Sequence, residues 1–110
     1  MSGIDGKLGP IRKGLLEFLI LKIVSVDRVY VADILKRLED TEFATQEGTL
    51  YPLLSKMRRE SLVDYDWKES ELGPPRKYYK LTPQGRRQLQ RAEQSFEQLV
   101  KGVRAMLRYA

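Results

Sequence analysis

Residues 47–57, EGTLYPLLSKM, combine a helical pattern with residues that usually weaken a helix. The apolar positions recur at i, i+3, i+4 and i+7, the spacing of one buried helical stripe. They are Leu50, Leu53, Leu54 and Met57. Gly48 and Pro52 are poor residues for the interior of a helix, and Tyr51 lies off the stripe. The segment therefore predicts a helix over about residues 46–60 whose second face serves another purpose.

That second face is small and flat, with hydroxyls and cations at its margins. On a wheel with ~100° per residue, its centre holds Gly48, Pro52, Ser55 and Arg59, with Tyr51 at one flank and Thr49 and Lys56 at the other. Little bulk lets a helix approach base edges in a DNA major groove, and the hydroxyls and cations supply donors. Taken alone, the stretch also fits an irregular first turn with Tyr51 as a half-buried surface aromatic.

Three further helices are expected from the apolar pattern. They span about residues 11–26, 31–39 and 83–108. Thr45 offers a hydroxyl N-cap to the helix of residues 46–60, and Thr82 followed by Pro83 is a strong helix start. The first helix is apolar almost all round, so it needs neighbours on more than one side, and one of them could belong to another chain.

Between the third and last helices the pattern changes to strict alternation. It predicts one strand over about residues 62–68 and a second over residues 76–81. The intervening Gly73-Pro74-Pro75 is expected to form the loop, with Arg76 and Lys77 at its exit. The expected order is three helices, a hairpin with a basic exit and a final helix. This order describes a mainly α fold with a small β-hairpin, the winged helix-turn-helix. In this fold the third helix reads the DNA groove and the hairpin touches the DNA backbone.

Composition narrows the class of function. The 110 residues suffice for one compact domain, and 42% hydrophobic with 32% charged residues fit a soluble globular protein. Cysteine and histidine are absent, which removes disulfides, thiol catalysis, soft-metal sites and imidazole chemistry. An enzyme would have to work with carboxylates, Lys, Tyr or Ser alone. We therefore expect no enzymatic activity, no metal and no cofactor.

Charge and hydropathy indicate the partner and the compartment. The net charge is +5, and basic residues cluster within residues 56–59 and 76–91. Local basic patches on a mixed chain point to a polyanionic partner. The start of the sequence has no apolar leader, and the longest apolar run is too short for a bilayer. We expect a cytoplasmic protein without membrane contact.

Two motifs carry a resemblance to a known family. EGTLYPLLSKMRRESLV at 47–63, followed by GPPRKYYKLTPQGRRQL at 73–89, resembles the short, single-domain members of the PadR family of bacterial winged-helix transcriptional regulators. The resemblance implies a homodimeric repressor of a pseudo-palindromic operator in double-stranded DNA, often released by a small hydrophobic effector or by stress. The motif positions that it implies for DNA contact are Gly48, Thr49, Tyr51 and Pro52 on the helix, and Arg76 and Lys77 on the hairpin, or wing.

The resemblance also implies how the chain dimerises. The last helix, about 26 residues or ~39 Å long at 1.5 Å per residue, would pack on the first helix of the partner. The expected interface combines Leu15, Phe18 and Leu19 with a heptad-spaced seam of Leu89, Ala92, Phe96, Leu99, Val103 and Met106. We expect residues 1–82 to form the DNA-binding domain and residues 83–110 the dimerisation helix, which packs on the same domain and on the partner chain.

The sequence departs from the family pattern at two places. Val29-Tyr30 stands where Gly-Tyr is common before the second helix. Ser61 stands where a glycine usually closes the recognition helix, so we expect its C-terminal cap to be made differently.

Several roles stay open in the sequence. Trp67 is expected to be a structural aromatic of the strand, with stacking on an effector between subunits as the alternative. Arg12 and Lys13 could contact the DNA backbone, and so could Arg86 and Arg87, whereas Arg91 is expected to solvate the last helix. The rival functions are a protein-interaction module and a ligand-sensing module without specific DNA binding.

Overall fold

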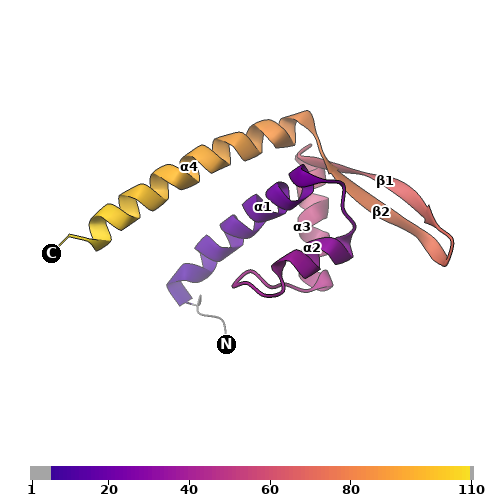
Figure 1. Cartoon of the computed structure of the whole chain (residues 1–110), viewed down its shortest axis with the longest axis horizontal. Helices are drawn as coiled ribbons and strands as arrows, with labels where there is room; N and C mark the ends of the chain where they lie inside the picture. Colours follow the sequence, from indigo (N-terminus) through magenta and orange to yellow (C-terminus); the bar gives the residue numbers. More distant parts are fainter. Residues whose placement is uncertain (1–5, 110) are drawn as a thin grey trace.

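The computed structural model describes residues 6–109 and contains the expected four helices and one hairpin (Figure 1). In chain order these are a 3₁₀ turn η1 (Gly6–Leu8), helices α1 (Gly9–Val26), α2 (Val31–Leu38) and α3 (Glu47–Arg59), strands β1 (Val63–Ser70) and β2 (Gly73–Leu81), and helix α4 (Pro83–Leu107). The prediction of a mainly α fold with a small hairpin is confirmed. None of the helices within residues 6–109 is long and apolar enough to cross a membrane.

The core lies where α1, α2, α3 and the base of the hairpin meet. The stripe of α3 faces it as predicted, because Leu50, Leu54 and Met57 are fully buried and Leu53 packs against them half-buried. The fully buried side chains from the other elements are Ile20, Ile34 and Val63. Burying one face of α3 leaves the face that carries Gly48 and Pro52 exposed.

The hairpin is antiparallel and is attached to the helical part at its base. Tyr65 pairs with Tyr79, and the backbone of Tyr79 also pairs with Val29, just before α2. In this second pairing, the Tyr79 N–H donates to the Val29 carbonyl at 2.8 Å, and the Val29 N–H donates to the Tyr79 carbonyl at 3.1 Å. The hairpin is therefore tied to the start of α2 as well as to α3.

The expected loop at Gly73-Pro74-Pro75 is wrong, because β2 already begins at Gly73 and the turn is Glu71-Leu72. The register explains how two prolines fit into a strand. Lys68 pairs with Arg76 and Ser70 pairs with Gly73, so both prolines oppose the single residue between Lys68 and Ser70. Such a bulge leaves backbone groups out of the ladder, and a proline has no N–H to lose there.

The two predicted N-caps have different outcomes. Thr82 caps α4, since its hydroxyl accepts the N–H of Gly85 at 2.9 Å. Thr45 does not cap α3. The helix starts one residue later, with Gln46 as its N-cap and without a side-chain cap bond. The Gln46 carbonyl accepts the first helical N–H groups instead, including that of Thr49 at 3.0 Å.

The C-terminus of α3 has the cap that glycine usually makes, although the residue is serine. Ser61 adopts a left-handed backbone with φ 63°. Its N–H donates to the Arg58 carbonyl at 2.9 Å, and the Leu62 N–H donates to the Met57 carbonyl at 2.9 Å. These two bonds form a Schellman motif. The expectation of a different cap is therefore wrong.

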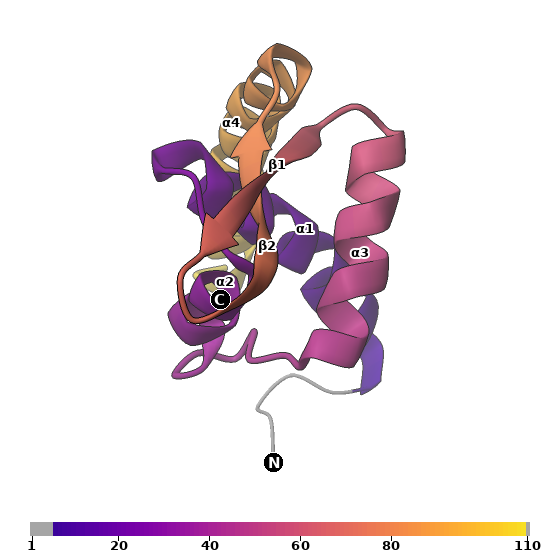
Figure 2. The same ribbon diagram turned by 90° about the vertical axis from the view of Figure 1, so that its right-hand side faces the viewer.

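The first half of helix α4 packs on α1, and the second half of α4 projects beyond α1. Leu89 is buried in the core, and the rings of Phe18 and Phe96 lie 5.7 Å apart. The C-terminal end of α4 lies at the opposite end of the longest axis from the tip of the hairpin (Figure 1). Viewed from the hairpin end, α3 lies to the right of the hairpin (Figure 2).

Candidate nucleic-acid interface

The outer face of α3 is exposed over its whole length. Every residue predicted there for DNA contact lies at the surface: Gly48, Thr49, Tyr51, Pro52, Ser55, Lys56 and Arg59. Tyr51 keeps 44% of its surface exposed, so the ring is available to a partner. Pro52 cannot donate to the Gly48 carbonyl four residues before it, and that carbonyl lies on the same exposed side, where solvent or a ligand can satisfy it.

One predicted cation of this face, Lys56, has a partner within the chain. Its ammonium lies 2.8 Å from the carboxylate of Glu17 on α1. The hydrogen bond and the charge of Glu17 raise the pKa of Lys56 above its ordinary value, so the side chain stays charged. Lys56 remains exposed, and a phosphate could replace the carboxylate.

Arg12 fixes the loop that precedes α3. Its guanidinium donates to the carbonyls of Glu42 and Ala44, at 2.9 Å and 2.8 Å. Lys13 on the next position of α1 is exposed and has no ion pair among the described residues. The two neighbouring cations therefore differ, because Arg12 holds the α2–α3 loop and Lys13 has no ion pair within residues 6–109.

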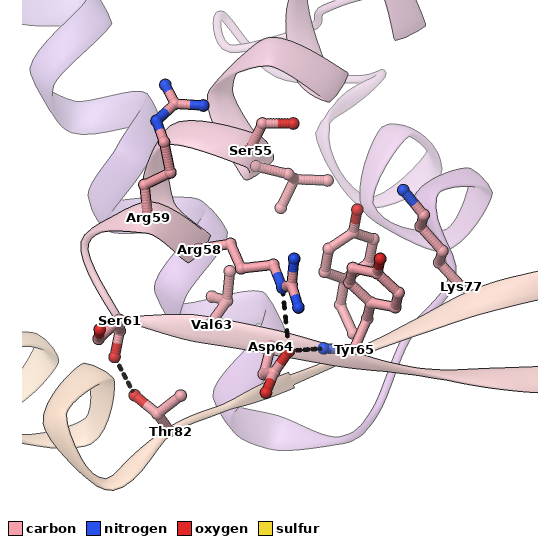
Figure 3. A pocket seen from close by; sticks show the side chains of 11 residues that line it. Ser55, Arg58, Arg59, Ser61, Val63, Asp64, Tyr65, Lys77 and Thr82 are labelled. Carbon is pink, nitrogen blue, oxygen red and sulfur yellow. Dashed lines mark hydrogen bonds and ion pairs between the residues drawn. The ribbon is translucent and has the colours of Figure 1, made fainter.

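Arg58, which sequence reasoning did not assign, joins α3 to the hairpin (Figure 3). Its Nε lies 3.1 Å from the carboxylate of Asp64. The backbone N–H of Tyr65 also donates to this carboxylate, and together with Arg58 it lowers the pKa of Asp64. The hydrogen bond between Arg58 and Asp64 also raises the pKa of Arg58. Arg58 thus links the end of α3 to β1, while the neighbouring Arg59 has no ion pair among residues 6–109 and faces solvent.

The two predicted cations of the hairpin rest on aromatic rings and not on acids. The Arg76 guanidinium lies 4.0 Å from the ring centroid of Tyr30, and the Lys77 ammonium lies 4.7 Å from that of Tyr65. Neither has an ion pair within the part of the chain that the structure describes. A ring orients a cation without cancelling its charge. The contact of Tyr30 with Arg76 was not predicted. The sequence shows only that Tyr30 is an aromatic residue just before α2.

Side chains of α3 and of the hairpin line a common groove, which brings the exposed rings of Tyr51 and Trp67 near the cations Arg76 and Lys77. A comparison with protein-family models finds a match over residues 20–91, to the family described as the transcriptional regulator PadR-like family. The chain belongs to this family. PadR-like regulators bind DNA and control transcription, and the sequence-based assignment to the family is confirmed.

Solved structures of PadR-like regulators have the same fold over nearly the whole chain. A PadR-like transcription factor from Bacteroides fragilis is 39% identical, with a TM-score of 0.79, covering 93% of this chain and 99% of the other. A PadR-like transcriptional regulator from Bacillus cereus is 37% identical, with a TM-score of 0.84, covering 93% and 100%. One from Eggerthella lenta is 30% identical, with a TM-score of 0.81, covering 92% and 88%. The comparison with curated protein sequences gave no match.

In this PadR-like chain, the residues expected at a dimer interface fall into three groups. Leu89 packs in the core of its own chain with 4% of its surface exposed, so it is not available to a partner. Leu15, Phe18 and Leu19 on α1 and Ala92 on α4 are half-buried. Phe96, Leu99, Val103 and Met106 are exposed on the projecting part of α4. Only the last group forms a free apolar surface.

An apolar groove of about 670 Å³ runs between the N-terminal part of α1 and the projecting half of α4. Ile11 and Leu15 line it from α1, and Leu99 and Val103 line it from α4.

The three arginines Arg86, Arg87 and Arg91 lie exposed on α4. No group of acids that could hold a metal ion occurs within the described residues.

Proposed function

We propose that this PadR-like regulator is a homodimeric repressor that binds a pseudo-palindromic operator. Helix α3 of each subunit would enter the major groove, and each hairpin would lie on the neighbouring backbone. The observation that carries the proposal is the exposed face of α3, which is small at Gly48 and Pro52 and flanked by hydroxyls and cations. A face of this shape brings backbone and short donors close to base edges.

The hairpin supports the same arrangement. Arg76 and Lys77 keep their charges, because aromatic rings hold them and no acid pairs with them among residues 6–109. Cations of this kind bind phosphates and set the register of a protein on DNA without reading bases. Base recognition would therefore rest with α3, and the hairpin would add affinity.

The exposed seam of α4 supports dimerisation. Leu99, Val103 and Met106 are 67%, 55% and 69% exposed, an unusual position for three large apolar side chains on one helix face. A partner subunit would cover them and fill the groove beside Ile11 and Leu15. A small hydrophobic effector could enter the same apolar region and change the distance between the two recognition helices, which would release the operator.

The experiment that tests DNA binding is a gel shift with the DNA upstream of the protein's own gene, with and without excess competitor DNA. We expect a shift that survives competitor and weakens steeply with salt, as counterions are released. Transcription in vitro from that DNA should fall when the protein is added. A protein-interaction module would give no shift at any salt concentration, and an activator would raise the transcript.

The dimer is tested by sedimentation of Leu99→Asp, with Gln98→Asp as its matched control. The first variant places a charge in the apolar seam, and an unpaired buried charge costs several kcal/mol. The second adds the same charge to an exposed neighbour outside the seam. We expect a monomer for Leu99→Asp and a dimer for Gln98→Asp and the wild type. A monomeric wild type at micromolar concentration would contradict the proposal.

A further inference from the structure

Trp67 occupies an unexpected place for the largest side chain of the hairpin. It was expected to serve the strand as a structural aromatic, yet 61% of its surface is exposed. Its ring meets Tyr65 edge-on at 5.8 Å, and the Lys77 ammonium lies 5.7 Å from its centroid. The C-terminal end of α4 lies at the opposite end of the molecule from the tip of the hairpin that carries Trp67 (Figure 1), so an effector bound between the α4 helices of two subunits would not lie beside β1.

A groove of about 290 Å³ separates Trp67 from the recognition helix. Tyr51 and Glu47 line it from α3, and Trp67, Arg76 and Lys77 line it from the hairpin. The groove therefore has an exposed aromatic ring on each side and two cations on one side. Both cations lack an ion pair within residues 6–109.

We propose that this groove seats one sugar–phosphate strand of duplex DNA and that Trp67 contacts that strand directly. The proposal rests on the DNA binding proposed above. When a helix lies in a major groove and a hairpin lies over the adjacent backbone, one strand has to pass between them. Arg76 and Lys77 meet its phosphates. The apolar face of the indole packs on the deoxyribose, and the indole N–H is a donor for a phosphate oxygen.

Glu47 sets the side of the groove on which the phosphates lie. It is the one acid among the described residues that line the groove, and it belongs to the first turn of α3. A carboxylate repels phosphate, so the phosphates sit toward the cations of the hairpin. That position places the sugar between the ring of Trp67 and the recognition helix.

The chain has one tryptophan, so its emission reports on this site alone. Binding of a fluorescein-labelled upstream duplex is followed by anisotropy, and tryptophan emission with acrylamide quenching is measured on the unlabelled duplex. We expect the emission to change and the acrylamide quenching to fall as the duplex saturates the protein. The affinity of Trp67→Ala should fall about tenfold, the equivalent of ~1.4 kcal/mol, for upstream and unrelated duplex alike.

Two variants keep the test independent of folding. Trp67→Phe keeps an aromatic face but loses the N–H donor, and it should bind with intermediate affinity. Val26→Ala removes an exposed apolar side chain outside the groove and should bind as the wild type does. If Trp67→Ala does not fold, acrylamide quenching of the wild type and the affinity of Trp67→Phe still show whether Trp67 contacts the DNA.

The outcomes separate this inference from the proposed function. If anisotropy shows binding while emission and acrylamide access of the wild type stay unchanged, Trp67 is not at the DNA and the inference is overturned, whereas DNA binding stands. A loss of affinity in Trp67→Ala without protection of the wild-type indole also overturns it, because the residue would then act only through the shape of the hairpin. Absence of any duplex binding at low salt overturns both.

Discussion

The ammonium of Lys56 on α3 lies 2.8 Å from the carboxylate of Glu17 on α1, so an acid of the same chain holds a cation of the surface that we propose to face DNA. Both side chains reach solvent, and exposed pairs of this kind add little to folding stability. The pair should matter more for the proposed binding of DNA. A phosphate that contacts Lys56 has to displace Glu17, and the displacement reduces the free energy gained.

Glu17→Gln should therefore tighten operator binding several-fold with little change in melting temperature, because Lys56 would no longer be held by a competing charge. Lys56→Ala is the matched background. In that background Glu17→Gln should have a clearly smaller effect, since only its long-range charge remains. Anisotropy titrations of the four proteins in this double-mutant cycle give the coupling. Equal effects of Glu17→Gln in both backgrounds would mean that Lys56 does not reach phosphate.

The hairpin cations predict a change in salt dependence. Replacing both Arg76 and Lys77 with Ala should weaken specific and unrelated DNA about equally, because phosphate contacts carry no base information. Each lost contact lowers the slope of log K against log salt by about 0.9, so a dimer that loses two per subunit should drop by about 3.6. Arg91→Ala with Lys101→Ala removes the same charge from α4 and should leave the slope near that of the wild type. An unchanged slope in the hairpin variant would place the hairpin away from DNA.

Much of the exposed surface of α3 could be predicted from the sequence, because it depends on local periodicity. The stripe of Leu50, Leu54 and Met57 predicts which face of α3 is buried, and the opposite face then has to be exposed. Thr82 followed by Pro83 predicted the start of α4 for the same reason, since a cap needs only its own neighbours.

The features that were missed depend on pairing through space. Gly73-Pro74-Pro75 looked like a loop, but the bulge that accommodates the prolines is set by the register of the other strand. Leu89 fits the heptad of α4, yet the packing of α4 on α1 buries it in its own chain. The ion pair of Arg58 with Asp64 and the placement of Arg76 on Tyr30 join residues that no local pattern connects.

The junction of α4 and the hairpin requires a glycine at position 85. A Cβ there would collide with the carbonyl oxygen of Leu62 and lie 2.9 Å from the Leu81 side chain. Gly85→Ala should therefore destabilise the fold by roughly 1–3 kcal/mol through overpacking. In the same helix, a Cβ on Gly102 would meet nothing within 4 Å. Gly102→Ala should be neutral or stabilise by about 0.5–1 kcal/mol. Urea denaturation measures the free energy of unfolding of both variants. Similar changes in the two variants would contradict the close approach of Gly85 to the Leu62 carbonyl.

The cap of α3 predicts a stabilising substitution. Ser61 holds a left-handed backbone with φ 63°, which a side chain with a Cβ adopts at a cost of roughly 1–2 kcal/mol. Ser61→Gly removes that cost, and part of the gain is lost to the greater freedom of glycine in the unfolded chain. The Ser61 carbonyl that accepts the Thr82 hydroxyl at 2.6 Å is backbone and is retained. We expect a net gain of up to ~1 kcal/mol in urea denaturation, whereas Ser61→Ala should give none.

The two faces of α3 should separate stability from recognition. Leu54 is fully buried, so Leu54→Ala should lower stability by roughly 2–5 kcal/mol through the cavity it leaves. Tyr51 lies at the flank of the outer face with 44% of its surface exposed, so Tyr51→Ala should melt close to the wild type. If the ring contacts a base or a positioning phosphate, operator affinity should fall by roughly 1–3 kcal/mol. Calorimetry and anisotropy on the same preparations measure the two quantities. Tyr51→Ala with unchanged operator affinity and a melting loss like that of Leu54→Ala would make Tyr51 a packing residue and remove it from the interface.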